Sequence, residues 1–182
     1  MEKNNRWFGV LLSLILLSLI NGCASSYQNR NIVGKTFPTV TGTSLDGQSM
    51  NIPSEFHGRK VLLILGYVQN SQFDIDRWLI GLDMTKTDIE VYELPTIQGL
   101  FPQFFETQIN QGMQKGIPKS LWKGVVTIFD GGQDVQQFTG NINPNNARVI
   151  LLNENNEIMF FDDSGFSVAS LNQLRAQIVK KL

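Results

Sequence analysis

Beyond residue 30, apolar residues occur in short runs of strand length that are separated by polar, glycine-containing turns. Three of these runs predict strands, and the first and third are apolar without alternation, as in strands that are buried on both faces of a sheet: residues 60–67, 89–94 and 125–129. Residues 37–50 surround the dipeptide Asp46-Gly47, which predicts a β-hairpin. Residues 149–161 predict a second hairpin around a polar turn.

Four segments between and after the strands carry apolar residues at the three- and four-residue spacing of a helix. They begin at Ser71, near residue 100, at Gly131 and near Ser167. Ser71 followed by Asp74 has the pattern of a capping box, which favours a helix start at that point. Three aromatic residues on these segments are expected in the core: Trp78, Phe104 and Phe105. Strands that alternate with helices in this order indicate an α/β sandwich around a central sheet.

The first 22 residues differ from the rest of the chain. Lys3 and Arg6 precede an apolar run over residues 7–20, which is shorter than the roughly 20 apolar residues of a comfortable membrane-spanning helix. This size and these flanks are typical of a secretory signal peptide. The alternative is an uncleaved anchor helix.

The sequence Ile20-Asn21-Gly22-Cys23 ends the apolar run and resembles a bacterial lipobox. The resemblance implies that residues 1–22 are removed and that Cys23 becomes a lipidated N-terminus carrying acyl chains such as palmitate. Such an anchor is stable because each buried methylene contributes about 0.8 kcal/mol. Residues 23–31 are then the lipidated cysteine and a tether, and residues 32–182 form the domain. Ala24 and Ser25 lack the aspartate of inner-membrane retention, which favours the outer membrane, facing the periplasm.

Charge and composition exclude one class of function. The chain has 15 Lys and Arg, 16 Asp and Glu and a net charge of -1, and no basic stripe or block occurs in it. Binding to nucleic acid therefore has no electrostatic support. The hydrophobic share of 42% predicts a globular protein, not a disordered one.

Six short motifs occur in the order in which one superfamily has them. They are Val33–Pro38, Ser44–Gln48, His57–Leu63, Ile128–Asp130, Phe138–Gly140 and Val149–Ile158. Together they resemble the thioredoxin superfamily, and most of all its membrane-tethered thiol-disulfide reductases and its peroxiredoxins. The resemblance implies a thioredoxin-like sandwich: a central mixed sheet with helices on both faces and an N-terminal β-hairpin.

The chemistry of that superfamily is missing from the motifs. Its redox-active members carry their cysteines at the start of the first helix after the first buried strand, where this chain has Val68-Gln69-Asn70-Ser71-Gln72-Phe73. The nucleophile of disulfide exchange must be a thiolate, and the only cysteine is Cys23. The proline that precedes the penultimate strand in active members is replaced by Ala147-Arg148. The resemblance therefore implies a redox-inactive relative.

A narrower likeness is to thioredoxin-fold proteins without paired cysteines that are related to a mitochondrial factor for ATP synthase assembly. The residues that carry it are Asp74-Ile75-Asp76-Arg77-Trp78 and the hairpin leading into Gly165. This likeness favours a role in protein assembly over catalysis.

No residue is assigned to catalysis, to a metal or to a cofactor. His57 is the only histidine and has no identifiable partner for general-base work. Asp74 and Asp76 lie two apart on a helix and so point to different sides, which makes them a poor pair of metal ligands. Residues 162–165 lack the ligand spacing of a calcium loop, and Gly131-Gly132 lacks the lysine and hydroxyl of a phosphate loop.

The surface that corresponds to the active site of the superfamily is the candidate binding groove. Its expected residues are Gln69, Asn70, Ser71, Phe73, Ala147 and Arg148, with Trp78 nearby. This groove receives extended polypeptide in the superfamily, so the first hypothesis is a membrane-anchored binding or assembly module with a protein or peptide partner. The alternatives are an enzyme of a non-thiol class and a residual oxidoreductase.

Overall fold

The computed structural model describes residues 26–99 and 104–180. The expected signal peptide and Cys23 lie outside these residues. Within the described ranges, no helix is long and apolar enough to cross a membrane.

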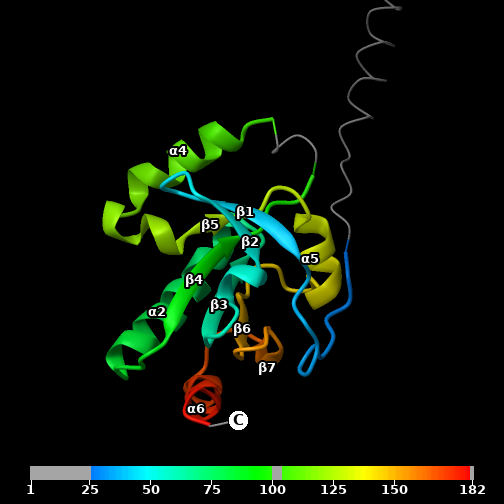
Figure 1. Cartoon of the computed structure of the whole chain (residues 1–182), viewed down its shortest axis with the longest axis vertical. Helices are drawn as coiled ribbons and strands as arrows, with labels where there is room; N and C mark the ends of the chain where they lie inside the picture. The colour runs from blue at the N-terminus through cyan, green and yellow to red at the C-terminus, as the bar shows by residue number, and fades with distance from the viewer. Residues whose placement is uncertain (1–25, 100–103, 181–182) are drawn as a thin grey trace, which may run out of the picture.

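The central sheet has four strands in the order β4-β3-β6-β7 (Figure 1). They are β3 (Val61–Gly66), β4 (Glu90–Pro95), β6 (Arg148–Leu152) and β7 (Ile158–Asp162). β4 pairs with β3 in parallel, whereas β6 pairs antiparallel with both β3 and β7, so the sheet is mixed. Every residue of β3 is buried, which confirms the strand expected from its continuous apolar run.

A smaller sheet covers one end of the central sheet and contains the N-terminal hairpin. Its order is β2-β1-β5, with β1 (Val40–Ser44), β2 (Ser49–Ile52) and β5 (Val126–Thr127). The hairpin turns at Asp46-Gly47, as predicted from the sequence, and Gly47 has a φ of 88°, which suits glycine. β5 is shorter than the apolar run 125–129, because the flanking Val125 and Ile128 form isolated parallel bridges to the β4 region instead.

Helices cover both faces of the central sheet, which confirms the predicted fold class (Figure 1). α2 (Gln72–Met84) and α6 (Val168–Ile178) pack on one face, and α5 (Gly132–Thr139) lies on the other face together with the hairpin. α4 (Glu106–Gly116) lies over the small sheet. Three short 3-10 helices complete the described elements: η1 (Ser54–Phe56), η2 (Gln69–Ser71) and η3 (Lys119–Gly124).

Two hydrophobic cores form because alternate residues of a strand point to opposite faces of the sheet. Leu62 and Ile64 of β3 face α2 and α6, and Trp78 packs there, fully buried, as expected. Leu63 and Leu65 face the hairpin and α5.

The expectation that Phe104 and Phe105 are core residues is wrong. Phe104 is 80% exposed and Phe105 is 53% exposed. Both residues precede the first residue of α4, so neither lies on the inner face of that helix. α4 itself is attached through polar contacts: Gln114 Nε2 donates to the Leu45 carbonyl (2.6 Å), and Thr127 Oγ1 donates to Asn110 Oδ1 (3.0 Å). Helical spacing identifies a face, but it does not say whether that face reaches a core.

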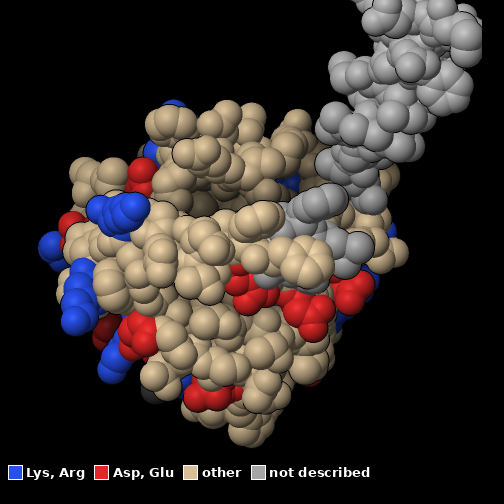
Figure 2. All heavy atoms as spheres, turned by 90° about the horizontal axis from the view of Figure 1, so that it is seen from above, with Lys and Arg blue, Asp and Glu red and all other residues tan. Residues whose placement is uncertain are grey.

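The face seen from above in Figure 2 carries mainly uncharged side chains. Most of the visible Lys and Arg side chains lie at one edge of this face with several Asp and Glu side chains among them, and further Asp and Glu side chains lie in small groups elsewhere on it. The described part of this face therefore has no continuous basic stripe of the kind that nucleic acid requires.

The predicted capping box at Ser71 and Asp74 is also wrong. Ser71 Oγ donates to the Val68 carbonyl (2.6 Å) and makes no cap for α2. Asp74 is buried, and its two oxygens accept the backbone N–H groups of Phe166 (2.8 Å) and Ala147 (2.9 Å). Asp74 thus joins α2 to the segment before β6 and to the segment before α6. Asp76 is an exposed charge, as expected.

Glu93 of β4 is a half-buried carboxyl group beneath α2. Its pKa is raised to about 7, chiefly by burial; a hydrogen bond from Gln72 opposes this rise, and the nearby Asp76 adds to it. Because a buried carboxylate loses hydration, the neutral form is favoured in the folded protein.

Replacing Asp74 is predicted to destabilise the fold. Asp74→Ala leaves two backbone N–H groups without their acceptor, and Asp74→Asn places an amide donor against one of them, so each should lower the free energy of unfolding by about 2 to 4 kcal/mol. Urea denaturation measures the change. Asp76→Asn, two residues away on the exposed side of α2, is the matched control and should stay within about 0.5 kcal/mol of wild type. If Asp74→Asn is as stable as this control, the hydrogen bonds that Asp74 accepts from Phe166 and Ala147 do not stabilise the fold as proposed.

Glu93 is predicted to make stability fall as pH rises. Its pKa is about 7 in the folded protein against an ordinary value of 4.5, so its favourable contribution is complete below pH 4.5 and is lost as pH rises through 7. Glu93→Gln does not titrate, so its stability relative to wild type should grow by roughly 1 to 3 kcal/mol between pH 4.5 and 8. Denaturant titrations across this range provide the measurement, and Glu55→Gln, at an exposed carboxyl, shows the effect of losing one negative charge alone. If the difference in stability between Glu93→Gln and wild type stays constant across this pH range, the raised pKa of Glu93 is contradicted.

Candidate functional site

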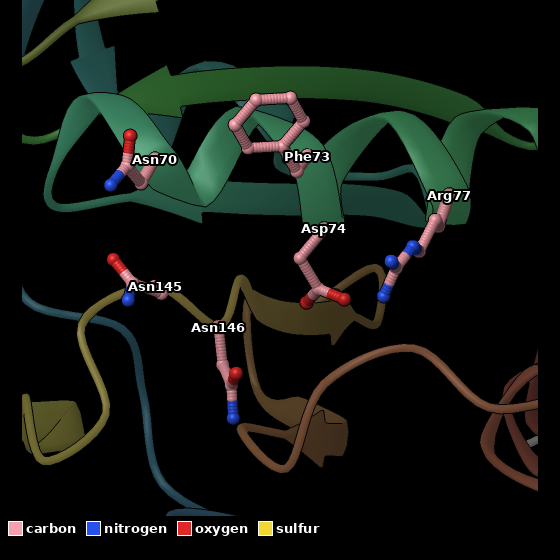
Figure 3. Close-up of a pocket in the computed structure, with 6 residues that line it drawn as sticks. All are labelled: Asn70, Phe73, Asp74, Arg77, Asn145 and Asn146. Carbon is pink, nitrogen blue, oxygen red and sulfur yellow. The ribbon is translucent and has the colours of Figure 1, made fainter.

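An open pocket lies between the start of α2 and the loop that precedes β6 (Figure 3). Its volume is about 330 Å³, and its lining residues are Asn70, Phe73, Asp74, Arg77, Asn145 and Asn146. The pocket occupies the region where the redox cysteines lie in the superfamily that the sequence resembles. Two residues of the expected groove, Asn70 and Phe73, line this pocket.

Two carboxamides stand across this pocket from each other. Asn70 projects from η2, directly before α2, and Asn145 projects from the opposite loop (Figure 3). Within the described residues, neither side chain forms a hydrogen bond with the protein, and the Arg77 guanidinium likewise has no protein partner there. Asn146 is different, because its Nδ2 donates to the Asp163 carbonyl (3.1 Å). The pocket therefore presents free donors and acceptors for a ligand.

An apolar ring and a buried carboxylate complete the pocket. Phe73 is 71% exposed and points away from the loop side in Figure 3. Asp74 is buried at the base, where both of its oxygens already accept backbone N–H groups. Amides, a guanidinium, a phenyl ring and a satisfied carboxylate bind ligands through hydrogen bonds and contact, and none of them is a thiol.

Arg148 holds the loop side of the pocket from within. Its side chain is fully buried and donates to four carbonyl groups of one loop. These are Gly140 (3.3 Å, from Nε), Ile142 (2.7 Å, from Nη2), Asn143 (3.1 Å) and Asn146 (2.7 Å), the last two from Nη1. Burial lowers the pKa of Arg148, and nearby Tyr67, Asp163 and Asp74 oppose that shift. An arginine stays charged in proteins, so the loop wraps around a permanent cation.

Tyr67 packs against this cation. The guanidinium carbon of Arg148 lies 5.0 Å from the centre of the Tyr67 ring, within cation–π range. The Tyr67 hydroxyl is hydrogen-bonded to Thr139 Oγ1. Burial raises the pKa of Tyr67 to about 12, so the phenol stays neutral at physiological pH and serves as a packing and hydrogen-bonding group.

The residues expected to form the groove divide into two sets. Asn70 and Phe73 line the pocket, and Gln69 is exposed beside it. The other three have buried side chains, so they support the pocket wall from behind: Ser71, Ala147 and Arg148. Whether the pocket binds a ligand stays a prediction.

Four lining residues were not expected in the groove from the sequence: Asp74, Arg77, Asn145 and Asn146. Asp74 was instead expected to cap the helix. Arg77 follows Phe73 by four residues and so shares its helix face, a signal that the helical spacing contained. Asn145 and Asn146 carry no comparable signal, because their position depends on how Arg148 folds the loop.

Two other candidate residues, His57 and Asp162, are not among those that line the pocket. His57 is exposed at the end of η1. Asp162 accepts hydrogen bonds from Ser164 in a turn, as expected. Within the ranges 26–99 and 104–180, no cluster of three or more His, Cys, Asp or Glu residues is arranged to hold a metal ion.

No family model and no curated protein sequence matches the chain. Among solved structures, the chain is similar to the thioredoxin domain of a thiol-disulfide oxidoreductase from Bacteroides vulgatus, with 18% identity, a TM-score of 0.53 and coverage of 83% of this chain and 100% of that chain. It is also similar to an exposed lipoprotein thioredoxin from Streptococcus pneumoniae, with 11% identity, a TM-score of 0.52 and coverage of 77% and 99%.

A third similar structure is BsSco, a member of the Sco family of cytochrome c oxidase assembly proteins, with 9% identity, a TM-score of 0.53 and coverage of 85% of this chain and 99% of that chain. At these identities the likeness concerns the fold alone. Together with the mixed sheet, its two helical layers and the N-terminal hairpin, it shows that the chain has a thioredoxin-like α/β fold.

Proposed function

We propose that the chain is a lipid-anchored, redox-inactive thioredoxin-like module of the cell envelope, which binds an extended segment of a partner protein in the Asn70–Asn145 pocket. The observation that carries this proposal is the pair of carboxamides without protein partners on opposite sides of the pocket. Asn70 falls near the position where the superfamily that the sequence resembles keeps a reactive thiol.

Carboxamides suit an extended backbone because each offers one acceptor and two donors. A peptide unit presents one N–H and one C=O, so two facing carboxamides can satisfy a unit that lies between them. Phe73 adds an exposed apolar ring beside the pocket, and Arg77 adds a cation for an acidic side chain or a carbonyl. Main-chain hydrogen bonds then provide affinity, and the flanking side chains provide selectivity.

Anchoring and an assembly role are supported by sequence and by analogy. The sequence before the domain resembles a lipobox at Cys23. Two proteins of similar fold are described as an exposed lipoprotein and as a member of a family of assembly proteins. The absence of cysteine from residues 24–182 is the reason for proposing redox inactivity.

The pocket proposal predicts a partner contact that depends on both carboxamides. A photo-reactive benzophenone residue placed at position 73 of the full chain, in living cells, should form a discrete protein adduct. Asn70→Ala with Asn145→Ala should reduce its yield by about 10-fold or more, because two lost hydrogen bonds cost roughly 1 kcal/mol each. Gln69→Ala, at an exposed residue outside the lining, is the matched control and should keep the adduct. An adduct that survives the double variant rules out the pocket as its binding site.

The redox proposal predicts no thiol-disulfide turnover. The detergent-solubilised full chain should reduce insulin disulfides no faster than the buffer does, because a carboxamide and a phenyl ring cannot form the mixed disulfide. An active thioredoxin assayed in the same detergent is the positive control. Turnover above the buffer rate would overturn the redox-inactive assignment and favour a residual oxidoreductase.

A further inference from the structure

The start of the described chain is fixed to the domain. Residues 27–29, here called the strap, lie in the stretch expected to be a tether, yet they pair with the loop after α5. Tyr27 N–H donates to Asn141 Oδ1 (2.7 Å), and Asn141 N–H donates back to the Tyr27 carbonyl (2.9 Å). Ile142 N–H donates to Asn29 Oδ1 (2.9 Å), and Asn29 Nδ2 donates to the Ile142 carbonyl (3.3 Å).

Glycine at position 140 makes this pairing close. Gly140 has a φ of 84°, and a Cβ atom there would lie 2.3 Å from the Asn29 Cα atom and 2.6 Å from the Gln28 carbonyl oxygen. Any side chain at this position would push the strap away. The strap is therefore a built part of the fold.

A docked strap leaves a very short free tether. Only four Cα-to-Cα steps separate Cys23 from Tyr27. Because an extended chain advances at most about 3.6 Å per residue, Tyr27 lies within about 14 Å of a lipid-bearing Cys23. With a lipid on Cys23, the loop that receives the strap would also lie near the bilayer surface.

The same loop forms one side of the pocket. Arg148 binds the Ile142 carbonyl, next to the strap, and the Asn146 carbonyl, at the pocket, each at 2.7 Å. One guanidinium group thus contacts both a carbonyl beside the strap and a carbonyl at the pocket wall. The far end of α2, at Met84, is 77% exposed and is separated from the pocket by the length of that helix.

From these contacts we infer that the pocket works at the bilayer surface, and that its partner is a segment of a membrane-bound protein lying close to that surface. This inference rests on the proposed function for two things, the lipid on Cys23 and the binding role of the pocket. It adds where the partner must be, because a pocket tied to so short a tether does not reach far into the surrounding space.

Fluorescence quenching tests the position of the pocket. Cys23 is the only cysteine and its sulfur is lipidated, so the lipidated full chain with Asn145→Cys or Met84→Cys accepts one dye at one site. In vesicles of phosphatidylethanolamine and phosphatidylglycerol with a quencher on the lipid headgroup, the dye at position 145 should be quenched at least about twofold more than the dye at 84. Gln69→Cys, beside the pocket, repeats the measurement without altering a lining residue. Equal quenching at all three positions overturns the inference.

A lengthened tether supplies the second arm of the test. About ten Gly and Ser residues inserted between Ser26 and Tyr27 add roughly 18 Å of flexible reach and should remove the difference in quenching. In cells, the same insertion should lower the yield of the position-73 adduct by about threefold or more if the partner lies at the membrane, because effective concentration falls with linker length.

The possible failures are distinguishable. An unchanged adduct yield with the long tether identifies a freely diffusing partner and overturns the inference about the partner, while the pocket itself still binds. If the adduct yield does not depend on Asn70 and Asn145, the proposed function is contradicted. The quenching measurement still decides where the pocket lies.

Discussion

The buried guanidinium of Arg148 is the group on which the arrangement of this end of the fold depends. A cation taken out of water is costly unless its donors are satisfied, and here four carbonyl groups of a single loop satisfy them beside the Tyr67 ring. The loop has no regular secondary structure of its own between α5 and β6. The loop therefore adopts the shape that brings its carbonyl groups to this one cation. That shape also positions the strap contact and the pocket wall.

Asp74 provides the opposite charge on the other side of the same segment. Arg148 donates to carbonyl groups before β6, among them that of Asn146. Asp74 accepts the N–H group of Ala147, so Asn146 and Ala147 are held from two directions. The Asp74 bond requires that position 147 is not proline, because proline has no N–H. A proline at this position, which the sequence resemblance implies for redox-active members of the superfamily, would therefore remove this hydrogen bond.

Strands and helices were predictable to the extent that burial follows from local pattern. The unbroken apolar run of β3 and the Asp46-Gly47 turn gave the central strand and the hairpin correctly. The prediction that Phe104 is buried was wrong because burial there depends on where α4 begins and on what that helix packs against. Neither follows from the spacing of apolar residues. Arg148 was expected at a surface, where charged residues usually lie. Its burial depends on carbonyls from residues 140–146, a set that only the folded loop brings together.

The proposed pocket and the proposed lipid anchor are best considered together, because both would affect how strongly a partner is bound. A thiol enzyme holds its partner covalently for part of its cycle, whereas two carboxamides, one ring and one guanidinium give reversible contacts. A pocket of about 330 Å³ is at the small end of ligand sites, so we expect any affinity for a free segment to be modest. If the proposed anchor confines the chain to a membrane that its proposed partner shares, the effective concentration rises, and avidity would rise without any new contact. In the proposed module, the lipid on Cys23 would thus contribute to binding, because it would keep a weak site near its partner.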